Sequence, residues 1–113
     1  MIESTPKFVQ GIFAFTGQGY ETSSALASYM VAADKRAQPV YLRVGNSSDE
    51  LVVLTLTRNG EIMRLFPVGA KSAQHVPLVV VEDISPDTEL ALSVAAPAGT
   101  AGTVVVDFGL VEV

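Results

Sequence analysis

The sequence predicts an all-β fold, a single antiparallel β-sandwich or jelly-roll-like domain. Runs rich in β-branched and aromatic residues alternate apolar with polar side chains. Turn-forming residues interrupt these runs at the spacing of about 8–12 residues that is typical of sandwiches and jelly rolls. With 113 residues the chain has the size of one domain. We interpret residues 1–20 as an N-terminal arm or first strand, and residues 21–113 as the β-sandwich domain.

The run from residue 8 to residue 15 has the pattern of a strand. Phe13 and Phe15 share one face, while Phe8 and Ile12 lie on the other. A strand that is apolar on both faces lies either within the core or against another subunit. The sequence leaves both alternatives open.

Residues 23–37 are compatible with a helix or a strand. Ser24 could cap a helix over residues 25–36, whose basic end would suit the helix dipole. Alternatively, residues 26–32 form a strand that turns into a new strand at Pro39. We favour the strand, because an all-β neighbourhood offers edges to pair with and proline suits the start of an edge strand.

The next run, residues 40–44, also alternates. Val40, Leu42 and Val44 are predicted on one face, with Tyr41 and Arg43 on the other. The polar residues that follow favour a turn.

A β-hairpin is predicted around Asn59-Gly60, because this dipeptide tolerates the positive φ angles of a two-residue loop. Such a loop places Arg58 opposite Glu61 and Thr57 opposite Ile62. The same register predicts three further pairs: Leu56 with Met63, Thr55 with Arg64, and Leu54 with Leu65.

Three more strands are expected in the C-terminal part. Residues 76–81 are continuously apolar, as in a strand that is buried on both faces or lies at an interface. Residues 89–95 and 103–112 alternate. Their inward residues are predicted to be Leu90, Leu92, Val94, Val104, Val106, Phe108 and Leu110.

Charge and composition exclude several function classes. The formal net charge is −5, from 12 acidic and 7 basic residues, so nucleic acid is not an expected partner. The chain has no cysteine, which excludes disulfides and thiolate chemistry. No apolar run approaches the ~18 residues of a membrane span, and the first residues do not have the pattern of a signal peptide. We therefore expect neither a membrane partner nor secretion by a signal peptide.

The sequence offers little for catalysis. His75 is the only histidine, and no nucleophile elbow accompanies it. Asp83, Asp87 and Glu89 could supply oxygen ligands for calcium, but their spacing is not that of a helix-loop-helix calcium loop and a polar turn is the simpler interpretation. We expect no enzyme activity and predict no catalytic, cofactor-binding or metal-binding residue.

The design as a whole resembles that of small decoration, or cement, proteins of tailed bacteriophage capsids. The features that carry this resemblance are the glycine-punctuated region Met1–Tyr20, the run Gln38-Pro39-Val40-Tyr41-Leu42-Arg43-Val44-Gly45-Asn46-Ser47-Ser48, the hairpin Thr57-Arg58-Asn59-Gly60-Glu61, and the Val- and Gly-rich strand that ends at Val113. No diagnostic motif adds to them.

The resemblance implies a non-enzymatic structural virion protein that stabilises a capsid by binding between major capsid subunits. It also implies a homotrimer on the capsid surface after synthesis in the host cytoplasm, with the major capsid protein as partner and residues 1–15 as a possible arm. Together with the early aromatic strand, it gives these candidate interface residues: Phe8, Ile12, Phe13, Phe15, Tyr41, Arg43, Arg64 and Phe66.

Two other function classes remain. The first is a β-sandwich binding module for carbohydrate or another ligand, in a phage tail, a baseplate or a bacterial accessory domain. The second is an enzyme or metal-dependent protein that uses His75 or Asp83.

Overall fold

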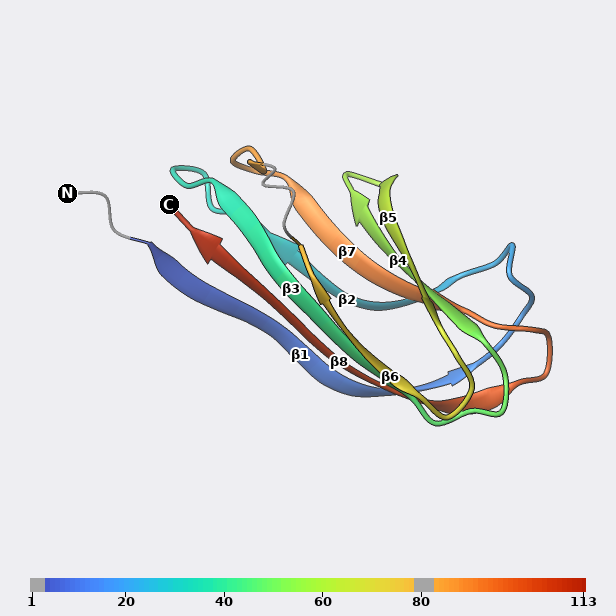
Figure 1. Cartoon of the computed structure of the whole chain (residues 1–113). Coiled ribbons are helices and arrows are strands. Elements are labelled where there is room, and N and C mark those ends of the chain that lie inside the picture. Colours follow the sequence, from blue (N-terminus) through green and yellow to red (C-terminus); the bar gives the residue numbers. More distant parts are fainter. Residues whose placement is uncertain (1–3, 79–82) are drawn as a thin grey trace.

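A computed structural model describes residues 4–78 and 83–113. Strands in this part of the chain form two antiparallel sheets that pack face to face (Figure 1), so the all-β expectation is confirmed. Over the same residues there is no helical segment that could act as a transmembrane span.

Each sheet has four strands. Sheet A has the order β1-β8-β3-β6 and sheet B the order β2-β7-β4-β5. The strands are β1 (Thr5–Thr16), β2 (Ser24–Met30), β3 (Ala37–Asn46), β4 (Val52–Arg58), β5 (Glu61–Val68), β6 (Ala73–Pro77), β7 (Glu89–Ala95) and β8 (Ala101–Glu112).

The strand pairs are nested around one central turn, as in a long two-stranded ribbon. β4 pairs with β5, β3 with β6, β2 with β7 and β1 with β8, all antiparallel. The centre of this nested series is the turn at Asn59-Gly60, where both residues have positive φ angles of 49° and 83°. A ribbon folded once at its centre and wound into two sheets is the jelly-roll arrangement. The predicted hairpin loop therefore lies at the topological centre of the fold.

The core lies between the two sheets and confirms the alternation predicted for β7 and β8. The seven side chains predicted to point inward from these strands are each at most 2% exposed. β2 confirms the strand interpretation of the ambiguous segment. Of the apolar run 76–81, Val76 and Pro77 end β6 and Leu78 is buried, while residues 79–82 lie outside the described residues.

Two β-bulges overturn predictions made from the sequence, one of a register and one of a face. In the hairpin, Arg58 faces Glu61 and Thr57 faces Ile62 as predicted, but the register shifts beside Leu56. The predicted pairs of Leu56 with Met63, Thr55 with Arg64 and Leu54 with Leu65 are therefore wrong. The observed pairs are Leu56 with Arg64, Thr55 with Leu65 and Leu54 with Phe66.

This bulge changes which side chains of β5 point into the core. It turns Phe66 and Val68 into the core, where they are 3% and 0% exposed, and leaves Leu65 outside. Burying the aromatic ring removes more apolar surface from water than burying Leu65 would.

The second bulge lies between Pro39 and Tyr41 in the pairing of β3 with β8. Leu42 and Val44 are buried as predicted, but Val40 is 47% exposed, so its placement on their face is wrong. The extra residue of the bulge interrupts the alternation at this point, so Val40 turns away from the face of Leu42 and Val44.

Residues Thr5–Thr16, for which the sequence left arm and strand open, form β1 at one edge of sheet A. β1 pairs with β8 without a register shift over its whole length. Phe15 belongs to the core, and Phe13 packs against it.

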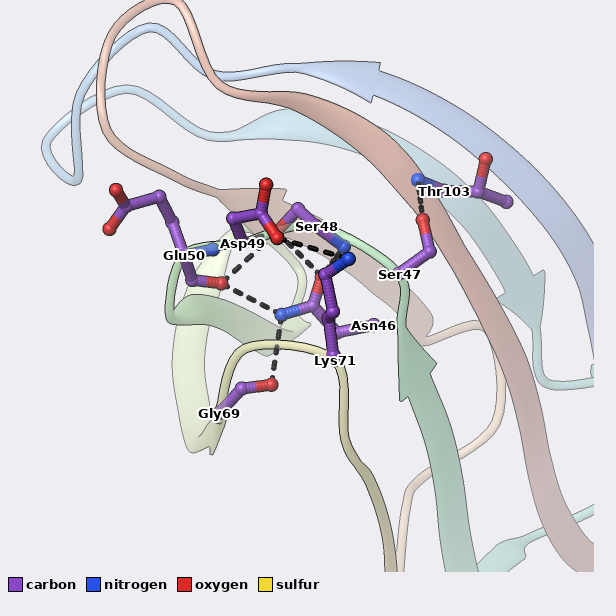
Figure 2. A network of polar contacts seen from close by, with 8 residues as sticks. All are labelled: Asn46, Ser47, Ser48, Asp49, Glu50, Gly69, Lys71 and Thr103. Carbon is purple, nitrogen blue, oxygen red and sulfur yellow. Dashed lines mark hydrogen bonds and ion pairs between the residues drawn. The ribbon is translucent and has the colours of Figure 1, made fainter.

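A buried polar cluster closes one end of the sandwich (Figure 2). The Asn46 side chain is 4% exposed, and its amide nitrogen donates to the carbonyls of Glu50 at 2.9 Å and Gly69 at 3.0 Å. Its Oδ1 accepts from the backbone N–H of Ser48 at 2.9 Å and from the Ser48 hydroxyl at 2.8 Å. An exposed ion pair of Lys71 with Asp49 lies beside it. The cluster thus ties the loop after β3 to the loop after β5.

A second buried contact lies near the other end, where the Tyr29 hydroxyl donates to Glu112. Glu112 is only 7% exposed. Burial, and then the hydrogen bond to this carboxylate, raise the pKa of Tyr29 well above its ordinary value of 10.0. The phenol therefore stays protonated and donates to Glu112 at neutral pH.

Candidate binding surface

The outer face of sheet A brings together polar and apolar side chains from all four of its strands. The registers align three rows across the sheet. The rows are Phe8–Gly109–Tyr41–Pro77, Gln10–Asp107–Arg43–His75 and Ile12–Val105–Gly45–Ala73. We call this surface the sheet A outer face.

Asp107 organises the middle of this face. Its Oδ1 accepts hydrogen bonds from the Gln10 amide at 2.9 Å and from the Tyr41 hydroxyl at 3.0 Å. These bonds join β1, β8 and β3 through side chains. The polar row is therefore held in place before any partner binds.

Tyr41 lies over Gly109 and needs a glycine there. A Cβ at Gly109 would lie 2.1 Å from Cε2 of the Tyr41 ring, closer than carbon atoms can approach. Burial, and then the bond to Asp107, raise the pKa of the Tyr41 hydroxyl, whereas Arg43 acts in the opposite direction. The ring is thus fixed on the sheet with its hydroxyl protonated.

Two further groups surround this ring. The Arg43 guanidinium carbon lies 5.5 Å from the Tyr41 ring centroid, within the range of a cation–π contact. The His75 ring meets Tyr41 edge to face, with centroids 5.8 Å apart. Since Arg43 is exposed, it can still bind an acceptor on a partner.

Apolar side chains flank the polar row on both sides. Phe8 is 57% exposed, Ile12 75% and Val105 50%. Beside them, an open hollow of about 600 Å³ is lined by Arg43, Val44, Gly45, Ala73, Gln74, His75, Val105 and Asp107. Its lining includes the small residues Gly45 and Ala73, beside the larger side chains of Arg43 and His75. A surface with fixed polar groups, exposed apolar groups and a hollow can bind another protein or a ligand.

The candidate interface residues fall into three groups. Phe8, Ile12, Tyr41 and Arg43 come together on the sheet A outer face. Phe13, Phe15 and Phe66 belong to the core or pack against it, so their side chains stabilise the sandwich. Arg64 is exposed on sheet B, with its guanidinium carbon 5.8 Å from the Phe66 ring centroid.

Four further residues of this face were not predicted from the sequence: Gln10, His75, Val105 and Asp107. The alternation of β8 carried a signal for two of them, because Val105 and Asp107 lie between its inward residues. Gln10 and His75 lie near these two residues only because strands that are distant in the sequence pair with one another.

Of the three carboxylates in the turn at 83–89, that of Asp83 has partners within the chain. Asp83 accepts from the Gln38 amide at 2.7 Å and lies 3.4 Å from Arg36. The backbone N–H of Glu89 donates to Asn59, and Asp87 has a positive φ of 60°. Over residues 4–78 and 83–113 no three His, Cys, Asp or Glu side chains gather as a metal site would require.

Comparison with known proteins identifies the fold. No family model matches the chain, and no curated protein matches it in sequence. Among solved structures, it is similar to the CBM36-1 domain of a multidomain xylanase from the hindgut metagenome of Trinervitermes trinervoides. The TM-score is 0.59 with 16% identity, covering 95% of this chain and 96% of that domain.

Two further structures share the fold. One is a subunit of Bacillus endospore appendages, described as disulfide-linked pili, with TM-score 0.54, 15% identity and coverage of 97% and 88%. The other is infectious bursal disease virus, Gx strain, with TM-score 0.58 and 14% identity; the match covers 97% of this chain but only 32% of the viral chain. At these identities the likeness concerns the β-sandwich fold alone.

Proposed function

We propose that the chain is a non-enzymatic structural protein of a virus particle, a decoration protein that binds between the major subunits of a phage capsid. The observation that carries the proposal is the sheet A outer face. It exposes Phe8, Ile12 and Val105 around a preorganised polar row that includes Arg43. A mixed surface of this kind is typical of a protein interface, where apolar groups supply burial and polar groups set the orientation.

The fold is consistent with this role. Viral proteins are among the solved structures that share the sandwich, including the bursal disease virus described above. A protein that binds only the assembled shell stabilises that state by mass action. Many symmetric copies then add their effects, so a modest affinity for each site is sufficient to stabilise the shell.

Docking on a capsid can be tested with heads of the phage that encodes the chain, purified without it. Sedimentation of the heads with added chain should show saturable binding and a higher disassembly temperature. Val105→Lys should weaken binding about tenfold or more, because it places a charge at the centre of the apolar contact. Leu65→Lys, at a similarly exposed position on sheet B, should bind like wild type. Absence of binding, or equal loss in both variants, would contradict the proposal.

A second function is favoured by the stacking of Tyr41. Its ring is fixed over Gly109 beside the hollow, with the polar side chains of Gln10, Asp107 and His75 nearby. An aromatic ring beside fixed polar groups is suited to a sugar ring, and one structure with this fold is a carbohydrate-binding module. In this case soluble oligosaccharides should raise the melting temperature of the wild type but not of Tyr41→Ala. Binding to capsids without any response to a glycan panel would exclude it.

A further inference from the structure

The four edge strands of the sandwich differ in how they are protected from pairing with another chain. The edges are β1 and β6 in sheet A, and β2 and β5 in sheet B. An edge strand exposes unpaired N–H and C=O groups, and proteins commonly protect such edges by short length, proline, charge or a bulge. Three of these edges have such protection. β6 has 5 residues and ends in Pro77, β2 has a bulge beside Ala25, and β5 has a bulge and Pro67.

The β1 edge has such protection only at its start, where Pro6 and Lys7 lie. β1 has 12 residues in unbroken register with β8, and Phe8–Thr16 contains no charged residue. Its outward side chains Phe8 and Ile12 are among the most exposed apolar groups of the described chain. In that part of the chain, no strand pairs with β1 on the side away from β8. Such an edge is a template for a further strand.

The direction of the free backbone groups follows from one hydrogen bond. The Gly17 N–H donates to the Thr100 carbonyl at 2.6 Å, next to the Thr16–Ala101 pair. Neighbouring residues of a strand point their backbone groups to opposite sides. Odd-numbered residues of β1 therefore bond with β8, and even-numbered residues point away from it. Phe8, Gln10 and Ile12 thus present free N–H and C=O groups, whereas Pro6 has no N–H to offer.

We propose that β1 is an interface through which two copies of the chain pair edge to edge, antiparallel about a two-fold axis at Gln10. The two A sheets then form one continuous sheet. In this register Phe8 lies opposite Ile12 of the second copy and exchanges two backbone hydrogen bonds with it, and Gln10 lies opposite Gln10. Both apolar pairs meet on the same outer face, which fits cross-strand stabilisation.

The strand itself favours this register over its neighbours. A shift by one residue would oppose outer to inner side chains, so only shifts by two are allowed. The next allowed register, centred on Gly11, puts the side-chain amide of Gln10 opposite Ile12. Phe8 then no longer faces Ile12. The register centred on Gln10 also keeps Lys7 opposite Phe13, so no like charges face each other. An isologous contact of this kind closes with two copies.

Opposite charges introduced at Phe8 and Ile12 test the register of this proposed dimer. Light scattering of the wild type, from micromolar to millimolar concentration, should show the mass rising from 11.9 kDa toward twice that value. Phe8→Glu and Ile12→Lys should each weaken dimerisation about tenfold or more, because each places a charge opposite an apolar side chain. The double variant should restore it in a salt-sensitive manner, since the introduced carboxylate then faces the introduced ammonium of the second copy. Ile62→Lys, at a 66% exposed position on β5, is the matched control and should dimerise normally.

Hydrogen exchange gives a second readout that needs no variant. The amides of Phe8, Gln10 and Ile12 should become protected as concentration rises. A monomer at every concentration, an oligomer unaffected by both single substitutions, or a double variant without rescue would overturn the proposal. Protection of these amides at every concentration would also overturn it, because it would mean that the chain covers its own edge. None of these outcomes bears on capsid docking through Val105.

Discussion

The polar cluster at Asn46 and the sheet A outer face both contain interlocked polar side chains, but they differ in burial. The Asn46 cluster is enclosed, and its amide group has partners for both its oxygen and its nitrogen (Figure 2). On the sheet A outer face, Asp107 binds two neighbours while Phe8, Ile12 and Val105 stay exposed. The enclosed cluster therefore stabilises the fold, while the open face is available for binding. Substitutions should therefore separate stability from binding.

The largest loss of stability is expected on replacing Asn46. Asn46→Ala leaves the buried N–H of Ser48 without its acceptor and removes the amide that bonds the carbonyls of Glu50 and Gly69, which should lower the free energy of unfolding by about 3 kcal/mol in urea denaturation. Asn46→Asp keeps the acceptor for Ser48 but turns a buried carboxylate oxygen toward the carbonyls of Glu50 and Gly69, so it should be at least as destabilising. Unchanged stability in both variants would mean that the cluster is incidental to the fold.

The next largest effect on the free energy of unfolding is expected for Tyr29 at alkaline pH. Because the folded state raises the pKa of Tyr29, the phenol ionises more readily in the unfolded chain. The contribution of Tyr29 to the free energy of unfolding should therefore be constant below about pH 10 and fall as the pH rises above it. Tyr29→Phe should be about 1–3 kcal/mol less stable at pH 7, since Glu112 loses its donor, and should show a weaker fall at high pH. Parallel pH profiles for the two proteins would refute this account.

A smaller effect is expected at Gly109. Gly109→Ala should displace the Tyr41 ring, break its bond to Asp107 and cost about 1 kcal/mol, because the ring can move aside. Adding Tyr41→Ala should remove the clash, so the double variant should be less destabilised than the sum of the two single variants. Strict additivity in thermal melts would show that the two residues are not coupled.

The smallest effect on stability is expected for Val105→Lys. Val105 is half exposed, so the free energy of unfolding should change by no more than about 0.5 kcal/mol. Calorimetry of this variant gives the stability control for its loss of binding. A large destabilisation would place Val105 with the enclosed cluster instead of the open face.

The sequence predicted those parts of the fold that depend on local pattern. Alternation identified the inward side chains of β7 and β8, and Asn59-Gly60 identified the hairpin at the centre of the jelly roll. Local pattern did not predict the bulges beside Leu56 and Val40, because the fit of each strand to its distant neighbours decides where an extra residue is inserted.

The candidate surface was predicted only in part for the same reason. Phe8, Ile12, Tyr41 and Arg43 stood out as aromatic, apolar or basic residues on alternating strands. Asp107 did not stand out, because its role depends on Gln10, which lies 97 residues away in the chain.

The most direct test of the sheet A outer face as the binding surface is chemical labelling of His75. This residue is the only histidine of the chain and lines the hollow beside Tyr41. Diethylpyrocarbonate labelling should be compared for the free chain and the chain bound to phage heads, with Lys71 as an exposed reference outside this face. We predict that binding slows the modification of His75 about tenfold or more while Lys71 reacts as before. Equal reactivity of His75 in the free and bound chain would contradict the account.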